Sequence, residues 1–143
     1  MERSKKINKE ISEKRLTDVL VSHIRKSSPV KREYRHYEKY IDLIGLIIDC
    51  NELMSVEVKV KNWQKAFQQA VVNLAVAEKS YVAIYSRYIH RVDLDRLRTC
   101  GIGLISVGSV WGEVQFIEPA QSSQLVNTIT NKRIKEKLCT SGA

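Results

Sequence analysis

The chain has 143 residues, 43% of them hydrophobic, and this length and composition suit one globular domain, residues 1–143, with a sizeable core. Its 24 lysines and arginines outnumber its 16 aspartates and glutamates and give a formal charge of +8, which favours acidic partners, with nucleic acid the first candidate. No segment approaches the run of roughly 18 apolar residues that a membrane helix needs, and the N-terminus lacks the apolar stretch of a signal peptide. Three widely spaced cysteines carry no zinc or redox motif, so we expect a cytoplasmic protein without a membrane segment.

The first half of the chain is predicted to hold a helix and a meander of three strands. Residues 11–25 place their apolar side chains on one stripe at helical spacing, and Pro29 then ends the pattern. Strands are expected over about 30–37 and 40–48, with turn-forming residues at 49–52. The third strand lies within "LMSVEVKVKNW", where valines alternate with Glu57, Lys59 and Lys61. This is the period of a strand with one buried face.

The second half is predicted to alternate helices and strands. A helix follows Asn62, a favourable N-cap residue, and "YVAIYS" then has the continuous apolar texture of a strand covered on both faces. A short helix closed by Gly101, strands at "IGLISV" and "EVQFIE", and a basic helix over about 123–138 complete the chain. The helix between the third and fourth strands implies a parallel pair, so the fold is expected to be α/β, with a mixed central sheet flanked by helices. The core would span about 11–107, and a hairpin and the basic helix would occupy 113–138.

Asp42 is the charged residue of the predicted second strand, and it interrupts the apolar run "YIDLIGLII". Burial of a lone carboxylate costs several kcal/mol unless it is paired or binds a metal. If residues 49–52 form the turn, Asp42 faces Lys59 and is a diagonal neighbour of Glu57. Two carboxylates, with the backbone carbonyl of Val58 as a third ligand, suit Mg²⁺ or Mn²⁺, which can polarise a phosphoryl oxygen and activate water.

A structural interpretation of the same residues stays open. Asp42 and Lys59 could form a salt bridge while Glu57 remains solvated, because a charged residue at every second position is common on amphipathic strands.

The ordered set of "YID", "VEVKVKNW" and "KAFQQA" resembles the PD-(D/E)XK superfamily of nucleases, and within it small members related to restriction endonucleases and archaeal Holliday-junction resolvases. The resemblance covers about residues 11–86 and implies a restriction-endonuclease-like αβββαβ core. It places the metal-binding carboxylates on Asp42 and Glu57 and the catalytic lysine on Lys59. It also implies a glutamine from the following helix, Gln69 before Gln68 and Gln64, and a glutamate from the first helix, Glu13 before Glu10.

The resemblance implies a Mg²⁺- or Mn²⁺-dependent deoxyribonuclease that hydrolyses phosphodiester bonds of DNA. The alternative is a catalytically inactive nucleic-acid-binding module on the same fold, and a subunit that binds neither DNA nor metal is a third hypothesis. A homodimer is expected because two-fold symmetry suits the cutting of two strands by one small domain.

Five basic residues are candidate contacts for the DNA backbone. Arg32 and Arg35 are interleaved with aromatic residues in the first strand, Lys61 continues the charges of the third, and Lys132 and Arg133 lie on the basic helix. Each could equally lie on a solvated face. His23 and Trp63 fall on apolar helical stripes and are expected in the core. Trp111 sits in a hairpin tip, where it could stack on a base, form a dimer contact or pack on its own sheet.

Overall fold

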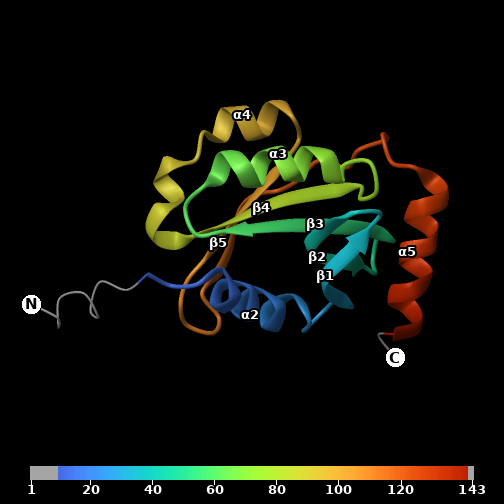
Figure 1. The fold of residues 1–143 in the computed structure, drawn as a ribbon, viewed down its shortest axis with the longest axis horizontal. Coiled ribbons are helices and arrows are strands. Elements are labelled where there is room, and N and C mark those ends of the chain that lie inside the picture. Colours follow the sequence, from blue (N-terminus) through green and yellow to red (C-terminus); the bar gives the residue numbers. More distant parts are fainter. Residues whose placement is uncertain (1–9, 142–143) are drawn as a thin grey trace, which may run out of the picture.

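Six strands form one mixed sheet with helices on both faces in the computed structural model, which describes residues 10–141 (Figure 1). The strands are β1 (Val30–His36), β2 (Lys39–Ile47), β3 (Glu52–Lys59), β4 (Lys79–Tyr85), β5 (Gly103–Val107) and β6 (Val114–Glu118). The helices are α2 (Glu13–Ile24), α3 (Trp63–Asn73), the 3-10 helix η1 (Ser86–Arg91), α4 (Leu94–Thr99) and α5 (Thr128–Ser141). No helix among residues 10–141 is both long and apolar enough to cross a membrane.

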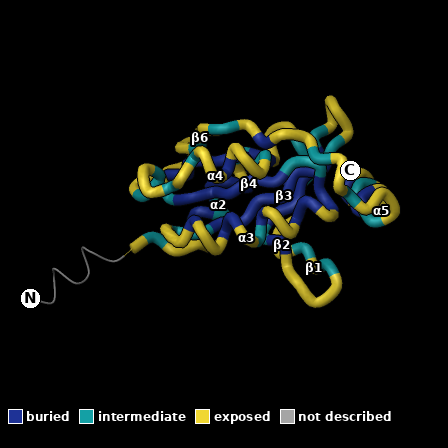
Figure 2. Tube along the Cα trace, turned by 90° about the horizontal axis from the view of Figure 1, so that it is seen from above, coloured by how far each residue is buried: buried dark blue, intermediate teal, exposed yellow. Residues whose placement is uncertain are grey.

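The strands lie in the order β1-β2-β3-β4-β5-β6. β3 and β4 run parallel, as do β4 and β5, whereas the outer pairs are antiparallel. The predicted mixed α/β sheet is therefore confirmed, together with the parallel pair that the α3 crossover implied. α2 covers one face, and α3 and α4 cover the other (Figure 1). β3 and β4 are buried between these layers (Figure 2).

Alternation along β3 divides its side chains between the two faces. Val56 and Val58 pack in the apolar cluster under α2, whereas Glu57 contacts α3. The predicted alternation is confirmed, but both faces of the strand are buried, including the charged one. A sheet covered on both faces leaves no solvated side for Glu57.

Helix starts are set by side-chain caps. Ser12 accepts a hydrogen bond from the Arg15 N–H at 3.1 Å, and Asn62 accepts one from the Lys65 N–H at 3.2 Å. Asn127 caps α5 by accepting from the Thr130 N–H, so this helix begins at Thr128 rather than near residue 123. The six-residue η1 was not predicted.

Glu78 holds α5 against the sheet. Its carboxylate accepts hydrogen bonds from the Leu53 N–H at 2.8 Å, the Asn131 side-chain amide at 3.0 Å and the Lys135 ammonium at 2.8 Å. Burial alone would raise the pKa of Glu78, but these hydrogen bonds outweigh it and the pKa is lowered. Glu78 therefore joins β3, the start of β4 and α5 in one polar cluster beneath the apolar contacts of Ile134.

Replacing Glu78 by alanine is expected to lower the free energy of unfolding by about 2–3 kcal/mol, because a buried N–H and a partly buried ammonium lose their acceptor. Chemical denaturation measures this change. Glu78→Gln keeps one acceptor oxygen and should lose less, and Glu136→Ala, at an exposed position of α5, is the matched control. Equal losses for Glu78→Ala and Glu136→Ala would contradict the anchoring role.

Candidate active site

β2 loses its regular pairing at Asp42. Its register with β1 is continuous except at the Glu33–Asp42 position, which is skipped, and its pairing with β3 ends at Leu43–Val56. Glu33 has a φ of 49°, in the left-handed region that non-glycine residues seldom adopt. Because Asp42 lacks a regular partner on either neighbouring strand, the strand pattern does not fix the direction of its side chain.

The alternation of apolar side chains also changes at this point. Leu43 packs in the cluster under α2, whereas Ile41, two residues earlier, packs with Ile44 in the cluster beside α5. In a regular strand residues 41 and 43 would share a face. The polar residue between them therefore marks a break in the pleat.

The Asp42 carboxylate takes the place of a missing ladder partner. Its Oδ2 accepts a hydrogen bond from the Val58 N–H at 2.8 Å. The N–H and C=O of one strand residue point to the same neighbouring strand, so the Val58 carbonyl is also directed toward the Asp42 side. The backbone of β3 thus presents both a donor and an acceptor at the carboxylate.

The register brings Asp42 opposite Glu57, which corrects the prediction that Asp42 faces Lys59. The pairs run from Ile47–Glu52 to Leu43–Val56, where the pairing ends, and the next residues along the two strands are Asp42 and Glu57. The turn spans residues 48–51, with the Asn51 N–H donating to the Ile48 carbonyl and Asn51 at a φ of 53°. The turn lies one residue earlier than predicted, so the partner of each β2 residue on β3 moves by two positions. A shift of two leaves each side chain on the same face of the sheet.

Glu57 is a buried acid with an altered proton affinity. Only 2% of it is exposed, and the Asn73 amide donates to its Oε2 at 2.8 Å. Burial first, and the charge of Asp42 second, raise the pKa of Glu57 to about 7, although the Asn73 hydrogen bond acts in the opposite direction. Two directly opposed carboxylates without a cation between them disfavour a second negative charge. A shared proton or a bound cation would relieve the repulsion.

Lys59 pairs with Glu13 rather than with Asp42. Its ammonium lies 3.7 Å from the Glu13 carboxylate, which comes from the first turn of α2. The fallback residue, Glu10, instead contacts Lys61 at 3.9 Å and the Tyr88 hydroxyl. The structural interpretation, an Asp42–Lys59 salt bridge beside a solvated Glu57, is therefore wrong on both counts.

The three candidate glutamines of α3 differ in whether they line a cavity beside Glu57. Gln69 and Gln68 line a cavity of about 360 Å³ together with Glu57 and Asn73, whereas Gln64 is exposed. Within the described part of the chain, the Gln69 Oε1 is the one buried side-chain oxygen or nitrogen that lacks a hydrogen-bond partner. Such an atom costs free energy unless water, an ion or a ligand satisfies it.

Asn73 was missed by the sequence reasoning. It follows Gln69 by four residues, so both lie on the same face of α3. A polar residue at a position of the apolar stripe was the signal that could have found it. Its amide fixes the Glu57 carboxylate from the helix side.

A second cavity, of about 300 Å³, adjoins the pair on the α2 side. It is lined by Glu13, Lys14, Thr17, Arg32, Glu33 and Asp42. Asp42 lines this cavity and Glu57 lines the one beside α3, so the two carboxylates stand between two openings. A phosphate group and water could each approach the pair from a different side.

The predicted backbone-binding residues are dispersed. Arg32 forms an ion pair with Asp18 at 2.6 Å, and this hydrogen bond is the main cause of the lowered pKa of Asp18. The Arg35 guanidinium donates to the Tyr37 carbonyl. Lys132 and Arg133 are exposed on α5, and α5 and the start of α2 lie at opposite ends of the molecule (Figure 1). The structure therefore does not bring the α5 pair to the carboxylates.

The exposed fractions of the remaining candidate side chains show which of them lie in the core. Trp63 is 8% exposed, which confirms its place in the core, and His23 is half-buried beside Phe116 at a ring distance of 6.2 Å. Trp111 is 53% exposed and is not packed into the sheet.

The donor set at the pair fits a hard divalent cation. Among residues 10–141, no three side chains of histidine, cysteine, aspartate or glutamate gather closely enough to hold a metal. Mg²⁺, however, commonly uses one or two carboxylates and completes its shell with water and substrate phosphate. Two adjacent carboxylates provide the oxygen-rich environment that such an ion prefers, and the raised pKa of Glu57 reflects a repulsion that a bound cation would relieve.

Comparisons with known proteins place the fold but no activity. No family model matches the sequence, and no curated protein matches it at a significant level. The solved SPO1766 protein of unknown function from Silicibacter pomeroyi is 16% identical, with a TM-score of 0.70 over 92% of this chain and 86% of that chain. SfsA of Pyrococcus furiosus, in complex with Ca²⁺, is 12% identical, with a TM-score of 0.40 over 78% of this chain and 62% of that chain.

Proposed function

We propose that this protein is a metal-dependent nuclease that hydrolyses phosphodiester bonds of DNA. The observation that carries the proposal is the pair of neighbouring carboxylates, Asp42 and Glu57, where β2 and β3 lose their regular pairing, with Lys59 two residues after Glu57 on the same strand. The first six major elements follow the order αβββαβ expected of a restriction-endonuclease-like core. The positive charge of +8 suits a polyanionic substrate.

Asp42 and Glu57 would hold Mg²⁺ or Mn²⁺, with the Val58 carbonyl as a further oxygen ligand. When bound, the ion supplies Lewis acidity to the scissile phosphate and activates water. Glu57, whose raised pKa favours a proton in the buried pair, would give up this proton and serve as an anionic ligand.

Lys59 would stabilise the negative charge that develops on the phosphate in the transition state. Its ammonium pairs with Glu13 at 3.7 Å, and a cation that is already positioned in a partly buried place would need little reorganisation when the charge appears. Gln69, which lines the same cavity as Glu57 and has a buried, unpartnered carbonyl oxygen, would orient water there. Asn73 would position the Glu57 carboxylate without contacting the substrate.

The direct test is cleavage of labelled DNA by the full chain with Mg²⁺, with Mn²⁺ and with a chelator. The substrates would be a blunt duplex, a single strand, a flap, a fork and a four-way junction. We expect cleavage that requires a divalent ion and is lost in Asp42→Asn, because this substitution keeps an acceptor for the Val58 N–H but removes a charge.

Metal-independent binding of the same DNAs without cleavage would contradict the enzyme and favour the alternative, an inactive binding module. Absence of both cleavage and binding would contradict both functions. The homodimer stays a prediction, which light scattering of the protein with and without DNA would test.

A further inference from the structure

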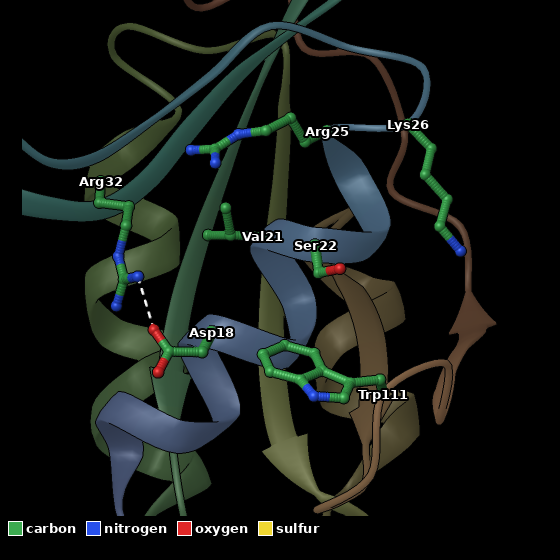
Figure 3. A pocket seen from close by; sticks show the side chains of 7 residues that line it. All are labelled: Asp18, Val21, Ser22, Arg25, Lys26, Arg32 and Trp111. Atoms are coloured by element: carbon green, nitrogen blue, oxygen red, sulfur yellow. Dashed lines mark hydrogen bonds and ion pairs between the residues drawn. The ribbon is translucent and has the colours of Figure 1, made fainter.

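A third cavity continues the opening at Asp42 along α2. It has a volume of about 460 Å³ and is lined by Asp18, Val21, Ser22, Arg25, Lys26, Arg32 and Trp111 (Figure 3). Arg32 also lines the cavity that contains Asp42, so the two openings adjoin at this residue. Their other residues from this part of the chain follow one another along α2, first Glu13 to Thr17 and then Asp18 to Ser22, with Arg25 and Lys26 just after the end of the helix.

Trp111 gives this cavity an aromatic wall. It comes from the turn between β5 and β6, and Figure 3 places its indole beside α2, next to Ser22. The Arg15 guanidinium lies 4.5 Å from the ring centroid and also donates to the Ser109 carbonyl at 3.0 Å. These contacts fix the indole from one side, while 53% of the residue remains exposed. A fixed and accessible indole suits stacking against a planar group.

Two cations line the same cavity as the indole without an anionic partner. Neither Arg25 nor Lys26 forms an ion pair or a side-chain hydrogen bond with any residue in the part of the chain that the structure describes. In Figure 3 their side chains diverge from the end of α2 in opposite directions, and Trp111 lies further down the cavity, below Ser22. The one acidic residue of the lining, Asp18, is already paired with Arg32 and Lys14. The cavity therefore presents net positive charge around a stacking surface.

We propose that this cavity, which we call the Trp111 cavity, binds an unpaired nucleotide segment of the DNA that enters the carboxylate site. The inference rests on the proposed function. A base would stack on Trp111, and Arg25 and Lys26 would contact the phosphates next to it. α2 has 12 residues and is about 18 Å long, so no more than about five stacked nucleotides would separate this base from the site. Bases of an intact duplex stack on one another and cannot reach the indole. The substrate class is therefore DNA with a single-stranded arm.

The test compares a forked duplex with a blunt duplex of the same paired sequence, by fluorescence anisotropy in a chelator, so that binding is measured without cleavage. Trp111→Ala is expected to weaken fork binding about 5- to 100-fold, and to leave blunt-duplex binding within about twofold. Trp111→Phe retains a stacking ring and should keep most of the affinity for the fork. Thermal melting of each variant verifies that it is folded.

Salt dependence tests the two cations. Arg25→Ala with Lys26→Ala should lower the slope of log K against log salt for the fork by about 1.4, which is about 0.7 for each phosphate contact with a single strand. The charge-matched control is Lys65→Ala with Arg87→Ala, at exposed positions outside the cavity, and it should leave the fork-to-blunt ratio unchanged.

An unchanged fork-to-blunt ratio in Trp111→Ala would overturn the Trp111 cavity as a nucleotide site, as would a Phe variant no better than the Ala variant. Failure of the proposed function is separate. A wild-type protein that prefers forks through Trp111 but never cuts them with Mg²⁺ would contradict the nuclease and support the Trp111 cavity.

Discussion

Replacing Lys59 by methionine is expected to reduce Mg²⁺-dependent DNA cleavage about 10²- to 10³-fold. Methionine keeps a long, unbranched side chain of similar reach but removes the ammonium. The side chain of Lys59 is 19% exposed, so its charge acts in a partly dehydrated place where it interacts more strongly than in water. The loss should fall on the rate of the chemical step, because Lys59 would act on charge that develops only in the transition state.

Single-turnover cleavage with saturating enzyme measures this rate directly. Lys65→Met is the matched control, since it removes the same charge from the exposed side of α3, and it should cut at the rate of the wild type. DNA binding by Lys59→Met should stay within about threefold, because one positive charge of many is lost. Retention of more than a tenth of the wild-type rate would contradict a role for Lys59 in the chemistry.

Glu13 offers a second measurement of the same arrangement. If it positions the Lys59 ammonium, Glu13→Gln should slow cleavage less than Lys59→Met, and the double variant should be no slower than Lys59→Met alone. This non-additivity is the signature of two residues that act as one unit.

The strands and their alternation could be predicted because they follow from local patterns. The valines at 56, 58 and 60 mark the third strand, and Asp42 is visible as a charge in an apolar run. The predicted order of strands and helices is confirmed, except for η1, which was not predicted. These features depend on periods of two and 3.6 residues, which the sequence displays directly.

The register and the side-chain partners could not be predicted in the same way. One residue in the position of the β2–β3 turn decides whether Asp42 opposes Glu57 or Lys59. The contact of Asn73 with Glu57 needs the packing of α3 on β3, and the contact of Arg15 with Ser109 joins residues 94 positions apart. Turn geometry and helix packing arise from the tertiary structure, so sequence patterns name the candidates but not their partners.

Glu57→Gln is expected to change how the stability of the metal-free protein depends on pH. The pKa of Glu57 is raised from 4.5 to about 7, so the native state holds this proton more tightly than the unfolded state. The stability that this proton provides is fully present below pH 4.5 and is lost as the pH rises to about 7, by roughly 3 kcal/mol in total. Glutamine is a neutral analogue of the protonated acid and can still accept from Asn73, so the variant should keep its stability through this range.

Denaturation of both proteins between pH 4.5 and 8.5 in a chelator gives the difference in the free energy of unfolding at each pH. Taking the difference removes contributions from other groups, such as His36, whose pKa is lowered by burial. Glu136→Gln, at an exposed position of α5, should run parallel to the wild type. A difference between wild type and Glu57→Gln that does not change with pH would show that Glu57 titrates as an ordinary carboxyl group.

Adding Mg²⁺ at pH 8 links this proton to the proposed metal. An ion that binds only the native state stabilises it by about 2.7 kcal/mol at a concentration 100 times its Kd, and the wild type should show such a gain while Glu57→Gln should not. Because the ion competes with the proton of Glu57, its affinity should rise about tenfold from pH 6 to pH 8. Calorimetry in two buffers should detect release of nearly one proton at pH 6 and almost none at pH 8. Stabilisation of the Glu57→Gln variant by the same Mg²⁺ concentration would place the ion elsewhere. The buried pair would then hold a shared proton for structural reasons, and the cleavage assay would have to find its metal outside β2 and β3.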